Sequence, residues 1–316
     1  MSSRIWPMSG IVAACPRCKA ALDDSVESWV CPACLHSYYP VEGRTYRLML
    51  DDERKSEHKD SVKRMFTSIH ETLEASGLSR FSTFVNWGYA DLEEREELQA
   101  HAVHRNSVRL LREAIGDTGV TGKDVLEIAC GRGGNVAALC KEFHPKSVVG
   151  MDLTEVNVLF CQNRNRHENA YFFVGDAELL PIGTASCDIV LTIEAADLFP
   201  NVHRFYEEVY RVLKPGGTFI YADDLPLSKF EEGEQYLRGV GFDFAFEKDI
   251  TENVLLSSDL TGNRRYSTLQ RDHEMEGALL ESIGLPGTRI YDEMREGTRK
   301  YKLARLVKPN DKRTGG

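Results

Sequence analysis

Four of the eight cysteines form two Cys-x-x-Cys pairs, and residues 19–30 separate the two pairs. Each pair turns the chain back so that both sulfurs face one point, and four thiolates are the ligand set of a closed tetrahedral zinc site. A segment this short buries too little apolar surface to fold alone, so metal binding would supply folding free energy. The spacing predicts a structural, non-catalytic zinc ion held by four residues: Cys15, Cys18, Cys31 and Cys34.

A second cluster, of glycines, follows an apolar stretch at residues 125–130 and precedes a helical pattern at 135–143. The glycines stand at 131, 133 and 134. Without a Cβ atom the backbone can turn tightly, and its N–H groups can approach a ligand at the helix N-terminus. The position of the cluster therefore predicts a ligand-binding loop.

Carboxylates on either side of this loop indicate the kind of ligand. Glu127 lies inside the end of the apolar stretch, where a dinucleotide site would avoid negative charge, and the loop is not a Gly-x-Gly-x-x-Gly pattern. A carboxylate there suits an ammonium group. Asp152 ends the next apolar stretch, where it would accept hydrogen bonds from two ribose hydroxyls. Together they favour a nucleoside that carries an amino acid.

The elements that would position these residues alternate between strands and helices. Short, almost continuously apolar runs predict strands whose two faces are both covered by helices, as in a parallel sheet. These runs lie at 125–130, 147–152, 170–176, 188–195 and 217–224, with helical patterns such as 135–143 and 202–213 between them. We expect a doubly wound α/β fold with its ligand crevice at the carboxyl ends of the strands.

At this point the chain resembles the class I S-adenosylmethionine-dependent methyltransferases of the small-molecule, natural-product type. The resemblance spans roughly residues 84–310 and includes the glycine loop, Asp152, "GDAELLPI" (175–182) and "YRVLKPGGTFIYAD" (210–223). It implies an enzyme with a Rossmann-like, seven-stranded domain and S-adenosylmethionine as cofactor. One departure is Ala129, which stands where the family often has glycine.

The resemblance also implies which residues bind the cofactor. Those matching the glycine loop face the methionine portion, the residue matching Asp152 holds the ribose, and the one matching Asp176 bonds the adenine amino group. The full expected set is Glu127, Ala129, Gly131, Gly133, Asp152, Leu153, Asp176, Ala177, Glu194 and Tyr89.

For the acceptor, "TIEAADLFPN" (192–201) resembles a segment of small-molecule methyltransferases in which a histidine often acts as general base. Ala196 and Asp197 stand at the matching positions, so that histidine is absent. Three interpretations stay open: Glu194 or Asp197 accepts the proton, His203 replaces the missing histidine, or positioning alone is sufficient. Glu194 would equally serve as a structural carboxylate.

The sequence divides into a zinc ribbon (1–50), a linker and helical cap (51–120) and the methyltransferase domain (121–316). The "YPV" strand after the cysteines resembles the ribbons that precede some methyltransferases. Within the cap, one helix is expected from Val62 to Leu73 and another from Asp91 to Ile115.

A lid is expected as an insertion at 225–280, before two last strands at 288–294 and 300–309. If its segment 242–246 is extended, three phenylalanines lie on one face. Aromatic residues of the lid and of nearby loops would then build an apolar acceptor pocket: Phe242, Phe244, Phe246, Trp87, Tyr89, Phe199 and Phe205.

The composition of the chain disfavours some classes of protein. The chain has 39 Lys and Arg against 49 Asp and Glu, a net charge of −10, which disfavours nucleic acid as a partner. No apolar run approaches the length of a membrane span and residues 1–10 do not resemble a secretory signal, so a cytoplasmic protein without a membrane segment is expected. Homo-oligomerisation is left open.

The function expected is methylation of O, N or C on a small, rather apolar acceptor, such as an isoprenoid or a polyketide-like compound of specialised metabolism. One alternative is a ribosomal RNA base methyltransferase whose zinc ribbon contacts RNA. A second alternative is a protein that binds S-adenosylmethionine without transferring a methyl group, such as a cyclase or an adaptor.

Overall fold

A computed structural model supplies the fold. It describes residues 10–22, 29–42, 45–50, 56–75, 77, 79, 82–94, 104–269, 280–281 and 284–310.

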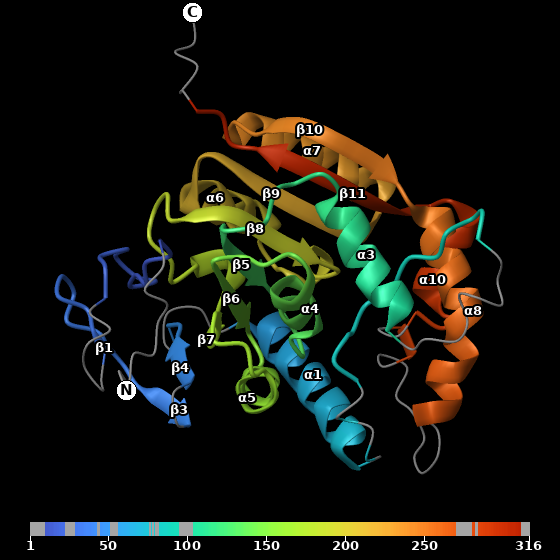
Figure 1. Ribbon diagram of the computed structural model, residues 1–316, viewed down its shortest axis with the longest axis horizontal. Coiled ribbons are helices and arrows are strands. Elements are labelled where there is room, and N and C mark those ends of the chain that lie inside the picture. Colours follow the sequence, from blue (N-terminus) through green and yellow to red (C-terminus); the bar gives the residue numbers. More distant parts are fainter. Residues whose placement is uncertain are drawn as a thin grey trace, which may run out of the picture.

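One large sheet forms the centre of the described chain (Figure 1). Its strand order is β10-β11-β9-β8-β5-β6-β7-β4-β3; β4 to β9 run parallel, whereas β3, β10 and β11 are antiparallel to their neighbours. The strands are β3 (Pro40–Glu42), β4 (Thr45–Leu48), β5 (Asp124–Ile128), β6 (Ser147–Asp152), β7 (Ala170–Gly175), β8 (Cys187–Ile193), β9 (Leu213–Pro226), β10 (Asp243–Asp249) and β11 (Arg299–Val307). The five strands predicted from apolar runs are confirmed as β5 to β9.

Helices cover both faces of this sheet. One face packs against α6 (Val202–Val212) and α7 (Leu227–Val240). The other face packs against α3 (Arg105–Ile115), α4 (Gly134–Glu142), α5 (Glu155–Arg164), α8 (Thr251–Leu269) and α10 (Arg289–Glu296). Burial on both faces explains why β5 and β6 have no exposed position.

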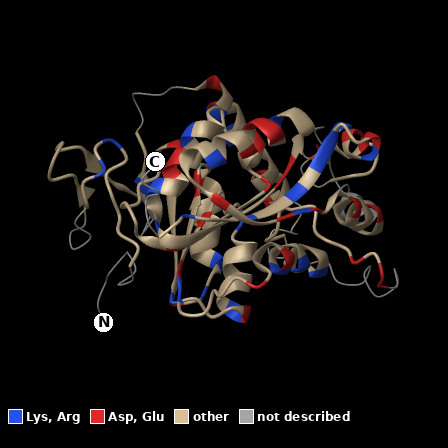
Figure 2. Cartoon of the chain, turned by 90° about the horizontal axis from the view of Figure 1, so that it is seen from above, with Lys and Arg blue, Asp and Glu red and all other residues tan. Residues whose placement is uncertain are grey.

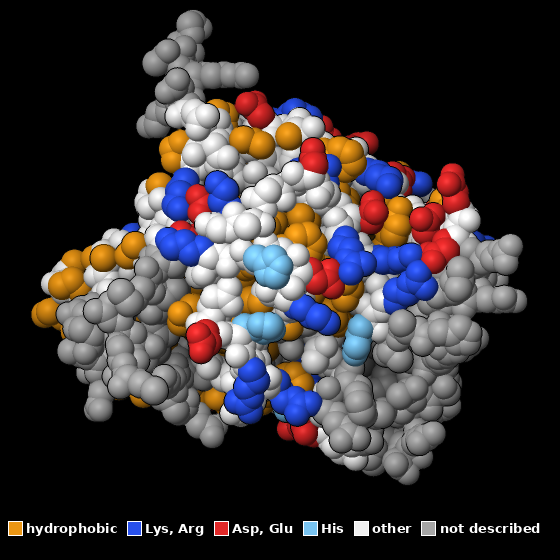
Figure 3. All heavy atoms as spheres, viewed as in Figure 1, with side chains coloured by type: hydrophobic (Ala, Val, Ile, Leu, Met, Phe, Trp, Pro, Cys, Tyr) orange, Lys and Arg blue, Asp and Glu red, His pale blue; other side chains and the backbone are white. Residues whose placement is uncertain are grey.

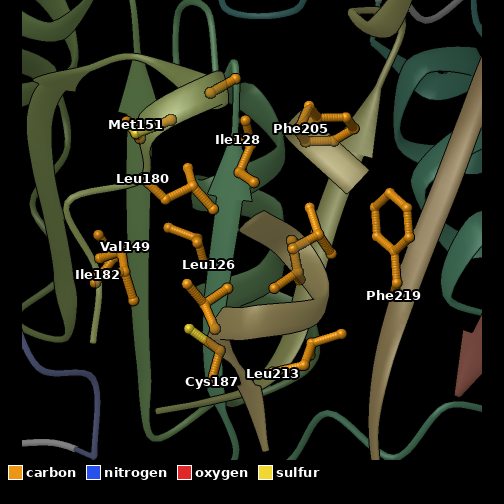
Figure 4. Packing of buried hydrophobic residues seen from close by; sticks show 14 of the residues in the cluster. Leu126, Ile128, Val149, Met151, Leu180, Ile182, Cys187, Phe205, Leu213 and Phe219 are labelled. Carbon is orange, nitrogen blue, oxygen red and sulfur yellow. The ribbon is translucent and has the colours of Figure 1, made fainter. Parts of the chain in front are cut away.

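Alternate side chains of each central strand enter the two cores. Leu126 of β5 and Val149 of β6 point to the α6 side, where Figure 4 shows them packed near Leu180 and Ile182. Val125 of β5 enters the core on the other face. This arrangement is the Rossmann-like, doubly wound fold that the sequence predicts.

The described residues from 10 to 50 include two pairs of short strands. The only two-stranded sheet among the described residues pairs β1 (Trp29–Val30) with β2 (Ser37–Tyr38). The next strands, β3 and β4, instead extend the central sheet beyond β7 (Figure 1). The predicted ribbon is therefore joined to the central sheet by strand pairing.

The first helix of the predicted cap is confirmed as α1 (Glu57–Ala75), which packs against α5. The second was predicted to begin at Asp91, but residues 91–94 are not helical and α3 begins at Arg105. Residues 95–103 of that prediction lie outside the described residues, as do 51–55 of the linker.

The predicted strand at 288–294 is wrong, because these residues belong to α10. Ile290, Tyr291 and Met294 lie on one side of this helix, Arg289 Nη1 pairs with Glu293 Oε1 at 2.7 Å, and Gly297 ends the helix with a φ of 81°.

The missing strand lies inside the predicted lid, as β10. Its residues Phe244 and Phe246 form part of the sheet edge, and Phe242 packs against Phe219 and Tyr210 in the core. The first part of the segment 225–280 therefore forms α7 and β10, and β10 pairs with β11 at the edge of the central sheet. Residues 270–279 lie outside the described residues.

Acidic and basic residues lie interspersed along the described helices and strands (Figure 2). None of the described helices is both long enough and apolar enough to span a membrane.

Candidate functional site

A pocket opens at the carboxyl ends of β5, β6, β7 and β8, where a parallel sheet is expected to bind its ligand. About 930 Å³ of space free of atoms lies in it, with open solvent at its mouth included. Its lining includes an acidic set of four residues: Glu127, Asp152, Asp176 and Glu178. It also includes an apolar set: Val62, Phe66, Phe84, Val85, Leu198 and Phe199.

The glycine loop forms the floor of this pocket. Gly131 has a φ of 51°, and no described atom lies within 4 Å of the place where a Cβ would be, so its backbone faces open space. A Cβ on Gly134 would lie 2.7 Å from the Thr83 carbonyl oxygen. Ala129, which replaces the family's usual glycine, also has a left-handed φ of 57°. Gly131 thus leaves its backbone accessible from the pocket, and Gly134 lets residues 83–84 approach the loop closely.

Asp152 is buried and fixes the glycine loop. Its Oδ2 accepts the backbone N–H of Gly131 at 2.9 Å, and its Oδ1 accepts that of Thr154 at 2.8 Å. Burial raises the pKa of this carboxyl above its usual value. Leu153 lines the pocket beside it.

Glu127 offers an atom for a ligand. Its side chain is buried, and Oε1 accepts a hydrogen bond from Asn135 Nδ2 at 2.9 Å. Among the described residues, Oε2 has no hydrogen-bond partner. Burial raises the pKa of Glu127 to about 8. A buried, unpaired carboxyl oxygen in the pocket fits the ammonium group expected there, because a nearby positive charge would stabilise its ionised form.

Asp176 and Glu178 are the two remaining residues of the acidic set. Asp176 follows β7, and Glu178 lies in the short 3₁₀ helix η2 (Ala177–Leu179). Lys59 of α1 lies between them, with its Nζ 2.7 Å from Asp176 Oδ2 and 2.6 Å from Glu178 Oε2. The sequence analysis missed Lys59 because it lies in a charged linker. Its spacing from Val62 and Phe66 was an available signal, since positions i, i+3 and i+7 share one helix face.

Arg132 is a second residue that the sequence analysis missed, although it lies within the glycine loop. Its guanidinium donates to the carbonyl oxygens of Ser82 at 2.6 Å and Ser79 at 3.2 Å, and Nη1 lies 2.6 Å from Nδ1 of His70 in α1. Burial lowers the pKa of Arg132 to about 10. Arg132 therefore attaches the loop to α1 and to the segment before Thr83.

Glu194 borders the pocket just after β8, with a φ of 57° that is rare for this residue type. Its carboxylate accepts the Trp87 backbone N–H at 2.9 and 3.2 Å and the Tyr301 hydroxyl at 2.8 Å. The buried Asp223 accepts the N–H groups of the next residues, Ala195 and Ala196. Both contacts hold this turn in place.

The structure brings most of the expected cofactor residues together. Glu127, Ala129, Gly131, Asp152, Leu153, Asp176, Ala177 and Glu194 all line the pocket. Gly133 lies behind it, at the start of α4 and against Cys161. Tyr89 is buried elsewhere, with its hydroxyl 3.4 Å from Lys248 Nζ.

Two of the expected catalytic residues lie outside the pocket. Asp197 pairs with Lys229 at 2.6 Å and lies 3.5 Å from Arg299. His203 stacks on Tyr236, with ring centroids 3.9 Å apart. Among the expected aromatic residues only Phe199 lines the pocket.

The four N-terminal cysteines converge as predicted, with all four sulfurs within 4.8 Å of one another. The two turns that carry them repeat the same geometry. Lys19 N–H donates to Cys15 O at 2.8 Å and Leu35 N–H to Cys31 O at 2.9 Å, and both residues have a positive φ. Four thiols at this separation fit a tetrahedral zinc ion, whose Zn–S bonds of about 2.3 Å need sulfurs this close together.

Comparisons with known proteins show the family of the chain. The methyltransferase domain family matches residues 126–221. The chain is 32% identical over 237 residues to a fatty-acid O-methyltransferase of Mycolicibacterium smegmatis, covering 72% of this chain and 83% of that protein. It is 31% identical over 236 residues to a phthiotriol/phenolphthiotriol dimycocerosates methyltransferase of Mycobacterium leprae, covering 71% and 85%.

Solved structures show the same fold at low identity. The [4+2]-cyclase SpnF matches with a TM-score of 0.66 and 17% identity over 80% of this chain and 97% of that one. The geranyl diphosphate C-methyltransferase of Streptomyces coelicolor A3(2), in complex with Mg²⁺, geranyl-S-thiolodiphosphate and S-adenosyl-L-homocysteine, matches with a TM-score of 0.60 and 16% identity, covering 81% and 99%. The resemblance, the enzyme class and the Rossmann-like fold expected from the sequence are thereby confirmed. The chain belongs to the class I S-adenosylmethionine-dependent methyltransferases.

Proposed function

We propose that this enzyme methylates an apolar small molecule of the lipid or isoprenoid class. The observation that carries the proposal is the mixed lining of the pocket, in which an acidic set and an apolar set of residues border one space. The acidic set suits the polar cofactor, and the apolar set, with Phe66 and Phe199, suits a hydrocarbon acceptor. The names of the similar proteins, which include a fatty-acid O-methyltransferase, support the same class of acceptor.

Three of the four residues of the acidic set have a proposed partner on the cofactor. Glu127 would pair with the cofactor ammonium group through its free oxygen, Asp152 would accept the ribose hydroxyls, and Asp176 would accept the adenine amino group. The bound cofactor supplies an electrophilic methyl group on a sulfonium sulfur. The chain would hold the acceptor atom in line with that methyl group and exclude water, which accounts for much of the acceleration of such a transfer.

We propose that Glu194 positions the site and does not remove a proton from the acceptor. Its carboxylate already accepts hydrogen bonds from Trp87 and Tyr301, and it fixes the segment that carries Phe84 and Val85. No histidine occurs among the described residues that line the pocket. An acceptor that is ionised when it reacts, such as a carboxylate, would need no general base.

We also propose that Cys15, Cys18, Cys31 and Cys34 hold one structural zinc ion. The closed set of four sulfurs leaves no position for a substrate, so this metal would take no part in methyl transfer.

The acceptor class can be tested with the enzyme, methyl-labelled S-adenosylmethionine and matched acceptors. Palmitate and butyrate share a carboxylate and differ in chain length, farnesol provides an isoprenoid, and total RNA tests the nucleic-acid alternative. We expect labelled product and S-adenosylhomocysteine with at least one long-chain acceptor and far less with butyrate. Equal turnover of palmitate and butyrate, or label in RNA alone, would contradict the proposal.

A matched pair of variants tests whether the pocket selects the long-chain acceptor. Phe199→Asn replaces an apolar residue that lines the pocket, whereas Phe246→Asn replaces a partly exposed phenylalanine on the edge strand β10. We expect Phe199→Asn to raise KM for the long-chain acceptor and Phe246→Asn to leave it unchanged.

A further inference from the structure

We infer that the cysteine-bearing module is a positioning element for the cofactor, because metal at its four sulfurs orders the segment 176–183. The module comprises the described residues from 10 to 48, and Lys19 makes one of its side-chain contacts to this segment. The inference rests on two proposals made above, zinc at the four cysteines and Asp176 at the adenine. It goes beyond them by connecting the two sites.

The first connection is backbone pairing immediately before the first cysteine. Ala14 N–H donates to Pro181 O at 2.9 Å, and Gly183 N–H donates to Val12 O at 2.7 Å. An isolated bridge pairs Ala13 with Ile182 between them. Residues 12–14 thus continue directly into Cys15 while they hold the end of the segment 176–183.

The second connection is a side chain within the first cysteine turn. Lys19 follows Cys18, and its Nζ donates to Leu180 O at 3.3 Å and lies 2.7 Å from Glu208 Oε2. The Glu208 side chain is only 3% exposed, and Arg211 donates both to Glu208 and to Leu180 O. The turn that carries Cys15 and Cys18 sets the direction of the Lys19 side chain. The positions of the two sulfurs therefore decide whether Lys19 reaches Leu180 O and Glu208.

The third connection is the strand that follows the module's own sheet. In β4, Leu48 pairs with Gly175 of β7, the residue before Asp176. Trp29 is fully buried and stacks on Tyr46 of β4, with ring centroids 4.6 Å apart. The module therefore contacts the acidic segment at both ends, at Gly175 and at residues 180–183.

These contacts make metal binding and cofactor binding interdependent. The described part of the module has only the two-residue strands β1 and β2 as its own sheet, so metal at the four sulfurs would fix the cysteine turns that this sheet does not. When the metal leaves, Lys19 and residues 12–14 lose their fixed positions, and Lys59 remains as the contact that holds Asp176. A coupling of this kind is reciprocal, so bound nucleoside must also retain the metal more tightly.

The test uses the full-length chain loaded with one equivalent of zinc. Zinc release to a metallochromic indicator is timed with and without saturating S-adenosylhomocysteine, and S-adenosylhomocysteine affinity is measured by calorimetry. The variant is Lys19→Ala. Its matched control is Leu35→Ala, at the equivalent position of the second turn, where the side chain is 76% exposed. Apolar side chains are visible at several places on the surface of the described chain (Figure 3).

We expect S-adenosylhomocysteine to slow zinc release about fivefold or more, within the usual range of coupling between sites. Lys19→Ala should keep its zinc, bind S-adenosylhomocysteine about tenfold more weakly and lose the slowing, whereas Leu35→Ala should behave as the wild type. If zinc removal unfolds the whole chain, the Lys19→Ala comparison still decides, because it is made with zinc bound.

Normal affinity in Lys19→Ala together with zinc release that ignores the nucleoside would overturn this inference and leave the proposed cofactor site intact. Absence of S-adenosylhomocysteine binding in the zinc-loaded wild type would instead reject the cofactor site itself. The two failures are therefore distinguishable.

Discussion

Lys59 Nζ lies 2.7 Å from Asp176 Oδ2, and this contact joins α1 to the acidic set that lines the pocket. Both side chains are about nine-tenths buried. The same helix contributes Val62 and Phe66 to the apolar lining of the pocket. Helix α1 thus lines the pocket with both polar and apolar side chains, and its buried Lys59 holds Asp176, the residue assigned to the adenine.

Replacing Lys59 by Met should lower the free energy of unfolding by about 3 kcal/mol, because Asp176 and Glu178 would stay buried without their partner. Urea unfolding measures this change. The control is Lys63→Met in the same helix, whose Nζ lies 3.8 Å from Asp60 on the surface and should contribute less than about 0.5 kcal/mol. Equal effects of the two variants would contradict the role assigned to Lys59.

The affinity for S-adenosylhomocysteine should rise with pH up to about 8. Burial raises the pKa of Glu127 to about 8, so below that pH the free enzyme must lose a proton before Glu127 can pair with an ammonium group. Glu127→Gln should bind more weakly at pH 8 and show a flat profile in calorimetry. Glu142→Gln, at a surface pair with Arg112, should keep the wild-type profile.

The same pKa has a consequence for stability. From the usual value of 4.5 up to about 8, folded Glu127 holds a proton that the unfolded chain has released, so its contribution to stability falls as pH rises through this window. Glu127→Gln should therefore lose less stability than the wild type between pH 5 and pH 8. Identical slopes in denaturant unfolding would show that Glu127 is ionised in the free enzyme.

Ala129→Gly should stabilise the protein by up to about 1 kcal/mol, because a left-handed φ of 57° strains alanine but not glycine. Thermal unfolding measures the change. The reference is Ala138→Gly inside α4, which should destabilise by about 1 kcal/mol. A loss of stability in Ala129→Gly would mean that the alanine methyl group contributes packing that outweighs the strain.

Glu194→Gln should leave the shape of the pH–rate profile unchanged and reduce kcat by less than about tenfold, because the side chain positions the segment at Trp87. Loss of a general base typically costs about 10²–10⁴-fold and removes a limb of the profile. Tyr301→Phe, which removes one donor to the same carboxylate, should show a similar small effect. A lost limb in Glu194→Gln alone would identify it as the base.

The sequence predicted those parts of the fold that depend on local patterns. Continuous apolar runs located the buried strands β5 to β9, and residue spacing located the thiol cluster and the glycine loop. The prediction failed where one residue pattern is compatible with two kinds of element. The few apolar residues of α10 were predicted to form a strand. The strand β10 was included in the predicted lid, because an edge strand with mostly exposed residues lacks the continuous apolar run of a buried strand.

The contacts that complete the site could not be read from local patterns. Lys59 and Arg132 become visible only when α1 lies across the carboxyl ends of the strands. Likewise, the joining of the N-terminal module to the sheet depends on strand pairing between residues far apart in the chain, such as Leu48 and Gly175.

A crystal structure of the enzyme with S-adenosylhomocysteine would show whether this pocket holds the cofactor. We expect the amino group within hydrogen-bond distance of Glu127 Oε2, the ribose hydroxyls at Asp152 and the adenine amino group beside Asp176. A nucleoside bound away from these three carboxylates would contradict the proposed cofactor site.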